Sequence, residues 1–154
     1  RAVERVAEAE LPTDFGPFHM VGYRSLIDDS EHIALIAGDI SDGEDVLVRV
    51  HAECLLGDVV CSTRCRCAEH LHRSMERIQQ EGRGALIYVR AQSAQGSGLL
   101  ARLGAYADGN DADSHKPPTD TKNYGTGSQI LRDLGVRSMR LLTMSALTAG
   151  RMMA

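Results

Sequence analysis

The 154-residue sequence predicts an α/β (α+β) fold, in which one domain spanning residues 1–154 holds a mixed β-sheet flanked by helices. Two observations predict it. Apolar segments with strand periodicity are interleaved along the chain with segments of helical periodicity. The length suits one domain with a substantial core, and neither an internal repeat nor a change in composition divides the chain.

Strands are expected mainly in the first third of the chain. A turn rich in Pro and Gly precedes an alternating segment at 18–22, and an apolar segment at 31–40 ends on Gly38 and Asp39. The segment 46–53 is strongly β in character. Its valines at 46, 48 and 50 face one side, while Leu47, Arg49 and His51 face the other.

Helices and further strands follow. Residues 68–82 predict a helix, because apolar residues recur at helical spacing and Gly82 stands at the C-cap position. A buried strand is expected at 84–90, and a glycine-rich loop entering a helix at 91–107. Residues 108–123 predict a polar surface loop, 125–135 a short helix that Gly135 ends, and 136–143 the last strand.

The composition argues against some classes of binding partner. A net charge of −4 and an aromatic content of 4% without Trp argue against a nucleic-acid surface. No apolar segment is long enough to span a membrane, and the start of the sequence lacks the apolar core of a secretory signal. We therefore expect a cytoplasmic protein whose thiols are reduced.

All four cysteines lie within fourteen residues, at Cys54, Cys61, Cys65 and Cys67. Clustered thiols in a reducing compartment favour a metal, and thiolates suit zinc. Three ligands would leave a position for chemistry, whereas a fourth, Cys61, would close a structural site. Unpaired reduced thiols are the other alternative. The valine-rich segment GDVV at 57–60 predicts a strand end, and we expect the next side chain, that of Cys61, to pack among apolar groups.

Several segments together resemble GTP cyclohydrolase II. They are RVHAECLLGDV, STRCRC, GSGLLARLGAYA, DTKNYGTG and ILRDLGVRSMRLLT, and the resemblance runs from about Leu11 to Thr143. It implies that family's fold, one zinc ion per chain on Cys54, Cys65 and Cys67, and a homodimer. In that family zinc-activated water opens the imidazole ring of guanine and formate leaves. Pyrophosphate is also released, with magnesium assisting.

The resemblance also implies the site residues. Glu53, Tyr106, Asp120 and Lys122 take the catalytic positions, with Lys122 where the family has a nucleophilic arginine. The substrate-binding positions are Arg49, His51, His70, Ser93, Gln95 and Thr143.

The departures from the family pattern gather on the substrate side. Ser93 and Gln95 stand where the family has glutamate and arginine, and Thr148 replaces a lysine in the segment that begins at Thr143. His70 occupies the position of a guanine-reading amide. The segment between Tyr106 and Asp120 is also several residues short.

We therefore expect a zinc-dependent hydrolase that opens a C–N bond of a purine-like or other cyclic amide substrate less anionic than GTP, in specialised metabolism. Magnesium is expected only if that substrate is phosphorylated. Two alternatives stay open: a genuine GTP cyclohydrolase II with Lys122 as nucleophile, and a non-catalytic relative with a four-cysteine zinc site.

Overall fold

A seven-stranded mixed sheet forms the centre of the protein, in the strand order β1-β2-β3-β5-β4-β6-β7. The computed structural model describes residues 2–90, 99–109, 121–143 and 149–153, and of 121–124 and 149–153 the backbone alone. Strand β4 pairs in parallel with β5 and β6, and the other pairs are antiparallel. The strands are β1 (Val3–Thr13), β2 (Gly16–Ser25), β3 (Glu31–Ala37), β4 (Val46–Ala52), β5 (Gly84–Val89), β6 (Ser138–Leu142) and β7 (Ala149–Met153).

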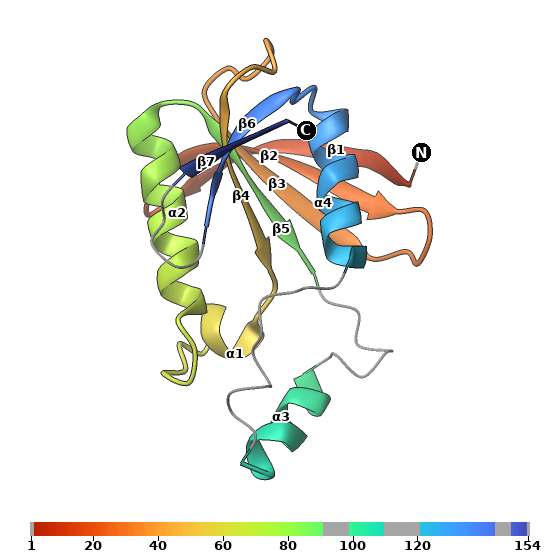
Figure 1. Cartoon of the computed structure of the whole chain (residues 1–154), viewed down its shortest axis with the longest axis vertical. Helices are drawn as coiled ribbons and strands as arrows, with labels where there is room; N and C mark the ends of the chain where they lie inside the picture. Colours follow the sequence, from red (N-terminus) through yellow and green to blue (C-terminus); the bar gives the residue numbers. More distant parts are fainter. Residues whose placement is uncertain (1, 91–98, 110–120, 144–148, 154) are drawn as a thin grey trace.

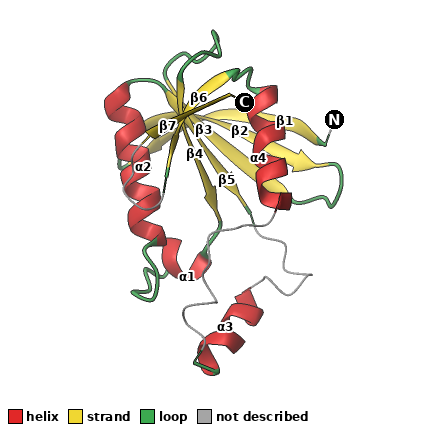
Figure 2. Cartoon of the chain, viewed as in Figure 1, coloured by secondary structure: helices red, strands yellow, loops and turns green. Residues whose placement is uncertain are grey.

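Helices cover both faces of this sheet. Figure 1 shows α2 (Cys67–Glu81) on one side and α4 (Thr121–Asp133) on the other. The short α1 (Leu55–Asp58) follows the lower end of β4, and α3 (Leu99–Ala107) lies beyond it (Figure 2). The expected mixed sheet flanked by helices is confirmed.

Strand β4 separates two cores. Val46 and Val48 belong to the core that includes Ile130 and Leu131 of α4, while Leu47 belongs to the one that includes Met75 and Ile78 of α2. The predicted alternation along this strand is therefore confirmed. Because side chains alternate along a strand, Arg49 and His51 lie on the α2 side, where they are 5% and 2% exposed.

Glycines end the two long helices as expected. Gly82 has φ +84°, and its N–H bonds the carbonyls of Ile78 and Gln79. Gly135 has φ +82°, and its N–H bonds the carbonyl of Arg132. A left-handed residue at this position satisfies the last carbonyls of a helix, and glycine adopts it without a steric penalty.

Four features differ from the expectations. Helix α4 begins at Thr121, inside the segment 108–123 that predicted a surface loop. Strand β1 was not predicted, because its outer positions carry charged residues such as Glu4, Glu8 and Glu10; such residues are common on the edge strand of a sheet. Strand β7 was not predicted either. The segment before Cys61 is not a strand end: it forms α1 and a turn, and Cys61 is exposed with φ +62°.

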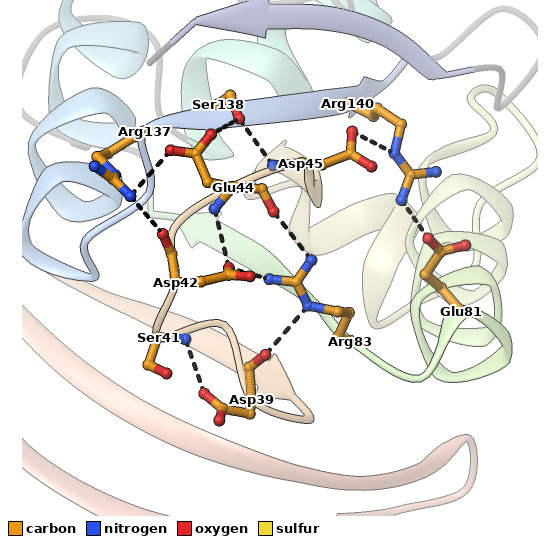
Figure 3. Close-up of polar contacts among 10 residues, drawn as sticks. All are labelled: Asp39, Ser41, Asp42, Glu44, Asp45, Glu81, Arg83, Arg137, Ser138 and Arg140. Atoms are coloured by element: carbon orange, nitrogen blue, oxygen red, sulfur yellow. Dashed lines mark hydrogen bonds and ion pairs between the residues drawn. The ribbon is translucent and has the colours of Figure 1, made fainter.

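A polar network braces the loop between β3 and β4, at the edge of the sheet where β4, β5 and β6 begin (Figure 3). Arg83 donates to the carbonyl oxygens of Asp39 and Glu44 and pairs with Asp42 at 2.6 Å. Arg140 pairs with Asp45 and Glu81. The carboxyl ends of the same strands lie at the opposite end of the sheet, where Cys54 follows β4.

No helix in the described part of the chain is long and apolar enough to cross a membrane.

Candidate metal centre and active site

Three cysteine sulfurs converge where β4 ends and α2 begins. Cys54 is the N-cap of α1, and Cys65 and Cys67 lie at the start of α2. Their sulfur atoms all lie within 4.8 Å of one another, and those of Cys54 and Cys65 are 3.8 Å apart. Two thiolates on one tetrahedral zinc, each about 2.3 Å from the ion, are separated by about 3.8 Å. The spacing therefore fits a shared zinc ion and is far too long for a disulfide.

Gly57 makes room for this cluster. A Cβ atom at this position would lie 2.6 Å from the Sγ atom of Cys65 and 3.2 Å from that of Cys54. The backbone N–H of Gly57 also donates to the Cys54 sulfur at 3.4 Å. Because Gly57 has no side chain, the helical turn α1 can lie in close contact with the cysteine sulfurs.

The electrostatics of the cluster favour a bound cation. Burial raises the pKa of the Cys54 and Cys67 thiols, and the neighbouring Cys54 raises that of Cys67 further. The Gly57 N–H and the Arg102 guanidinium act in the opposite direction on Cys54. A divalent cation among the three sulfurs would offset the cost of burying thiolate charge.

Cys61 lies outside this cluster. The three-sulfur group of the described residues excludes it, and the thiol of Cys61 is exposed, 3.9 Å from the carbonyl oxygen of Val59. The geometry favours an open three-ligand site over a closed four-cysteine one.

Three of the residues expected to bind substrate come together between β4 and α2. Arg49 and His51 are hydrogen-bonded to each other, with Nη2 of Arg49 3.4 Å from Nδ1 of His51. His70 is buried on α2, and burial followed by the positive charge of Arg49 lowers its pKa. Its Nδ1 atom has no hydrogen-bond partner among the described residues. A buried imidazole of this kind is suited to pairing with a polar group of a ligand.

Two of the expected catalytic residues lie at the margin of the cluster. Glu53 follows β4 and pairs with Arg90 at 3.2 Å. The ring of Tyr106, on α3, stacks beneath the guanidinium of Arg64 at 4.4 Å. Since Arg64 directly precedes Cys65, this contact holds α3 beside the cysteine segment.

For the remaining predicted positions the structure gives less detail. Ser93, Gln95 and Asp120 lie outside the described residues, and of Lys122, in the first turn of α4, only the backbone is described. Thr143 follows β6 and is exposed. Their roles stay predictions.

The structure adds three residues that the sequence reasoning missed. Asp58 accepts hydrogen bonds from the backbone N–H of Cys54 and, at 2.7 Å, from the hydroxyl of Tyr88. Arg102 donates from α3 to the Cys54 sulfur at 2.9 Å. Asp58 stands four residues after Cys54, one helical turn away, and this spacing was the available signal. Nothing in the sequence placed α3 against the cysteines.

A mixed sheet flanked by helices, with three thiols gathered at the carboxyl end of the central strand β4, defines an α+β protein with a candidate metal centre. The family model for GTP cyclohydrolase II matches residues 4–152. The chain belongs to the GTP cyclohydrolase II family.

Curated relatives agree with this assignment. The chain is 53% identical over 150 residues to the riboflavin biosynthesis protein RibBA of Nocardia farcinica, a match covering 93% of this chain and 36% of that protein. It is 52% identical over 150 residues to RibBA of Salinispora arenicola, with the same coverage. The chain thus spans little more than a third of the length of these relatives.

A solved structure shares the fold. It is the crystal structure of RibBX, a two-domain 3,4-dihydroxy-2-butanone 4-phosphate synthase from A. baumannii. The TM-score is 0.56 at 26% identity, and the match covers 94% of this chain and 35% of that one.

Proposed function

We propose that this protein is a zinc-dependent hydrolase of the GTP cyclohydrolase II type, which opens a C–N bond in the ring of a purine-like substrate. The observation that carries the proposal is the convergence of three cysteine sulfurs within 4.8 Å around a glycine. A zinc ion on three protein ligands supplies a Lewis acid and lowers the pKa of water to about 7.

The chain's own residues would bind and orient the ring. Arg49 and His51 extend from β4, and His70 faces them from α2. Buried polar groups of this kind fix the orientation of a ligand and reject analogues that leave them unpaired. Glu53 and Tyr106 flank the cluster and would move protons at the ring together with Asp120.

The proposed substrate is less anionic than GTP. Gln95 and Thr148 stand where the family pattern has cations, and hydrogen bonds to charged groups contribute about 1.5–3 kcal/mol each. Two losses amount to about 3–6 kcal/mol, or about 10² to 10⁴ in affinity for a triphosphate. Lys122 also lacks the planar fork of the arginine it replaces. Magnesium would be needed only if the true substrate carries phosphates.

GTP itself is the second candidate. The observation in its favour is the identity of 53% to a protein named for riboflavin biosynthesis. In this case the amine of Lys122, after losing a proton, would attack the α-phosphate, and the bond to the β-phosphate would break with release of pyrophosphate.

A substrate panel separates the two candidates. Zinc-loaded protein is incubated with GTP, GMP and guanosine, and formate release and product mass are measured, with Cys65→Ser as the control. Ring opening of GMP or guanosine that exceeds that of GTP is expected. Turnover of GTP at about 1 per second or faster, with the others inert, would instead establish the second candidate.

A further inference from the structure

We propose that Asp58 is a positioning residue that couples the metal-binding segment to the substrate-facing strand β4. The inference rests on the proposed function in one respect, namely that Cys54 is a metal ligand. It assigns a role to a residue that is not one of the three candidate metal ligands.

The side chain of Asp58 receives hydrogen bonds from three separate elements. The backbone N–H of Cys54 donates to Oδ2 at 3.1 Å, and the hydroxyl of Tyr88, on β5, donates to the same oxygen at 2.7 Å. Nε2 of His51, on β4, lies 3.0 Å from Oδ1. The side chains of Asp58 and His51 are each 3% exposed. One buried carboxylate therefore connects the backbone of Cys54, a candidate metal ligand, to the two strands β4 and β5.

The hydrogen-bond donors and acceptors around Asp58 and His51 are mutually consistent. Arg49 has only donors, so its contact with His51 makes Nδ1 of that ring the acceptor. The hydrogen of His51 then lies on Nε2 and points at Asp58. The rings of His51 and Tyr88 stack with centroids 5.6 Å apart, so the two donors pack against each other beside the carboxylate. Asp58 thus selects one tautomer and one ring orientation for His51.

An amide at position 58 would break this pattern. An asparagine side chain has a single oxygen, which can accept hydrogen bonds on one side of the group only. Its NH₂ group, a donor, would then face another hydrogen-bond donor on the other side. If the NH₂ group faces His51, the imidazole must move its hydrogen to Nδ1, where Arg49 already donates. If it faces Cys54, the backbone N–H of a metal ligand loses its acceptor. Either outcome displaces a functional group without removing it.

The chain offers a matched control at Asp133. This carboxylate also accepts a tyrosine hydroxyl, from Tyr23 at 2.6 Å, and it pairs with Arg5. It lies at the end of α4, on the opposite face of the sheet from α2. Asp133→Asn therefore removes a comparable interaction away from the cysteine cluster.

The experiment compares Asp58→Asn with Asp133→Asn by zinc affinity from chelator competition and by the absorption spectrum of the Co²⁺-substituted protein. Asp58→Asn is expected to weaken zinc binding about 10- to 100-fold and to shift the thiolate-to-cobalt band. Asp133→Asn is expected to keep both, although both variants lower the thermal stability. Equal zinc affinity and equal spectra in the two variants would overturn the inference.

A second readout does not depend on a metal. The imidazole ¹⁵N shifts of His51 in the metal-free protein should show a protonated Nε2 in the wild type and in Asp133→Asn, and a loss of that preference in Asp58→Asn. If Asp58→Asn does not fold, Tyr88→Phe against Tyr23→Phe repeats the comparison with one hydrogen bond removed. A wild type that binds neither Zn²⁺ nor Co²⁺ would refute the proposed function, while an unchanged His51 tautomer in Asp58→Asn would refute the role of Asp58.

Discussion

The guanidinium of Arg102 lies 2.9 Å from the sulfur of Cys54, so α3 donates a hydrogen bond to a residue from the end of β4. This contact joins segments 48 positions apart in the sequence. Three thiolates on one Zn²⁺ leave a net negative charge, and a neighbouring cation compensates it. Arg102 is therefore placed to tune the metal centre from outside its ligand shell.

Replacing Arg102 should weaken the metal site. Arg102→Leu is expected to lower zinc affinity by about 10-fold, because it removes both the charge and the donor at the Cys54 sulfur. Chelator competition measures the change, and Arg102→Lys should recover part of it through its charge.

Arg66 is the matched control for this prediction. It stands between two of the cysteines, but its guanidinium pairs with Glu69 at 2.8 Å and is largely exposed. Arg66→Leu should leave zinc affinity unchanged. An equal loss in both variants would mean that general positive charge, and not the contact with Cys54, is responsible.

A methyl group on Gly57 should damage the site by steric conflict. Its Cβ atom would lie 2.6 Å from the sulfur of Cys65, so Gly57→Ala must displace either α1 or the cysteines. The expected cost is about 1–3 kcal/mol, seen as a loss of zinc affinity of about 5- to 150-fold. Gly104→Ala is the control, because nothing lies within 4 Å of its Cβ position on α3. That change should be neutral or stabilising, and zinc affinity equal to wild type in Gly57→Ala would contradict the prediction.

Metal analysis should distinguish the four cysteines. The wild-type protein is expected to carry about one zinc per chain, Cys65→Ser much less, and Cys61→Ser as much as the wild type. The reason is that Cys65 belongs to the cluster and the exposed Cys61 does not. Zinc lost from Cys61→Ser, or four sulfurs around the metal in X-ray absorption, would favour the structural four-cysteine site.

Local patterns were sufficient to predict most of the fold. The alternation in β4 and the spacing that ends at Gly82 depend on neighbours in the sequence, and both are confirmed. Strand β1 could not be predicted in this way. Its pairing with β2 stabilises it as an edge strand, and its own side chains past Val3 are mostly exposed.

The cysteine cluster was predictable for a similar reason, whereas its surroundings were not. The three cysteines lie close together in sequence, so spacing alone suggested a shared ion. The bond between Tyr88 and Asp58 joins residues 30 positions apart and depends on β5 pairing with β4. The packing of Cys61 was predicted wrongly, because the segment before it forms the helical turn α1 followed by a tight turn, and the thiol is exposed.

Association with a second copy of the chain stays a prediction. Exposed apolar side chains gather on α1 and the turn after it, at Leu55, Val59 and Val60, and on α3, at Leu99, Leu100 and Leu103. Water contact with such groups is unfavourable, and an interface would remove it. Light scattering at micromolar concentration should give the mass of a homodimer, and a monomer mass would refute this.

The stability of the metal-free protein should fall as the pH is lowered, because of His32. This buried residue accepts a hydrogen bond on Nδ1 from the backbone N–H of Arg90 at 2.9 Å, and its Nε2 atom lies 2.8 Å from the hydroxyl of Ser30. That hydroxyl donates to Asp28, so it accepts from Nε2, and both ring nitrogens are committed to the neutral form. Protonation of Nδ1 would break the link between β3 and the end of β5.

Burial lowers the pKa of His32; among its charged neighbours Asp28 and Glu53 oppose this shift and Arg90 adds to it. The unfolded chain, with a histidine pKa near 6.5, then binds more protons than the folded one between the two pKa values. The stabilisation is therefore complete above about pH 6.5 and is lost as the pH falls toward the folded pKa, by at most about 1.4 kcal/mol per pH unit. Urea unfolding of reduced protein from pH 8 to pH 5 measures this loss of stability, and His32→Gln should flatten the acid side of the curve.

His19 is the control, because hydrogen bonds to Glu8 and Glu10 raise its pKa and its contribution to stability is lost as the pH rises. His19→Gln should leave the acid-side loss in place, and the same acid-side slope in His32→Gln and the wild type would show that another group is responsible.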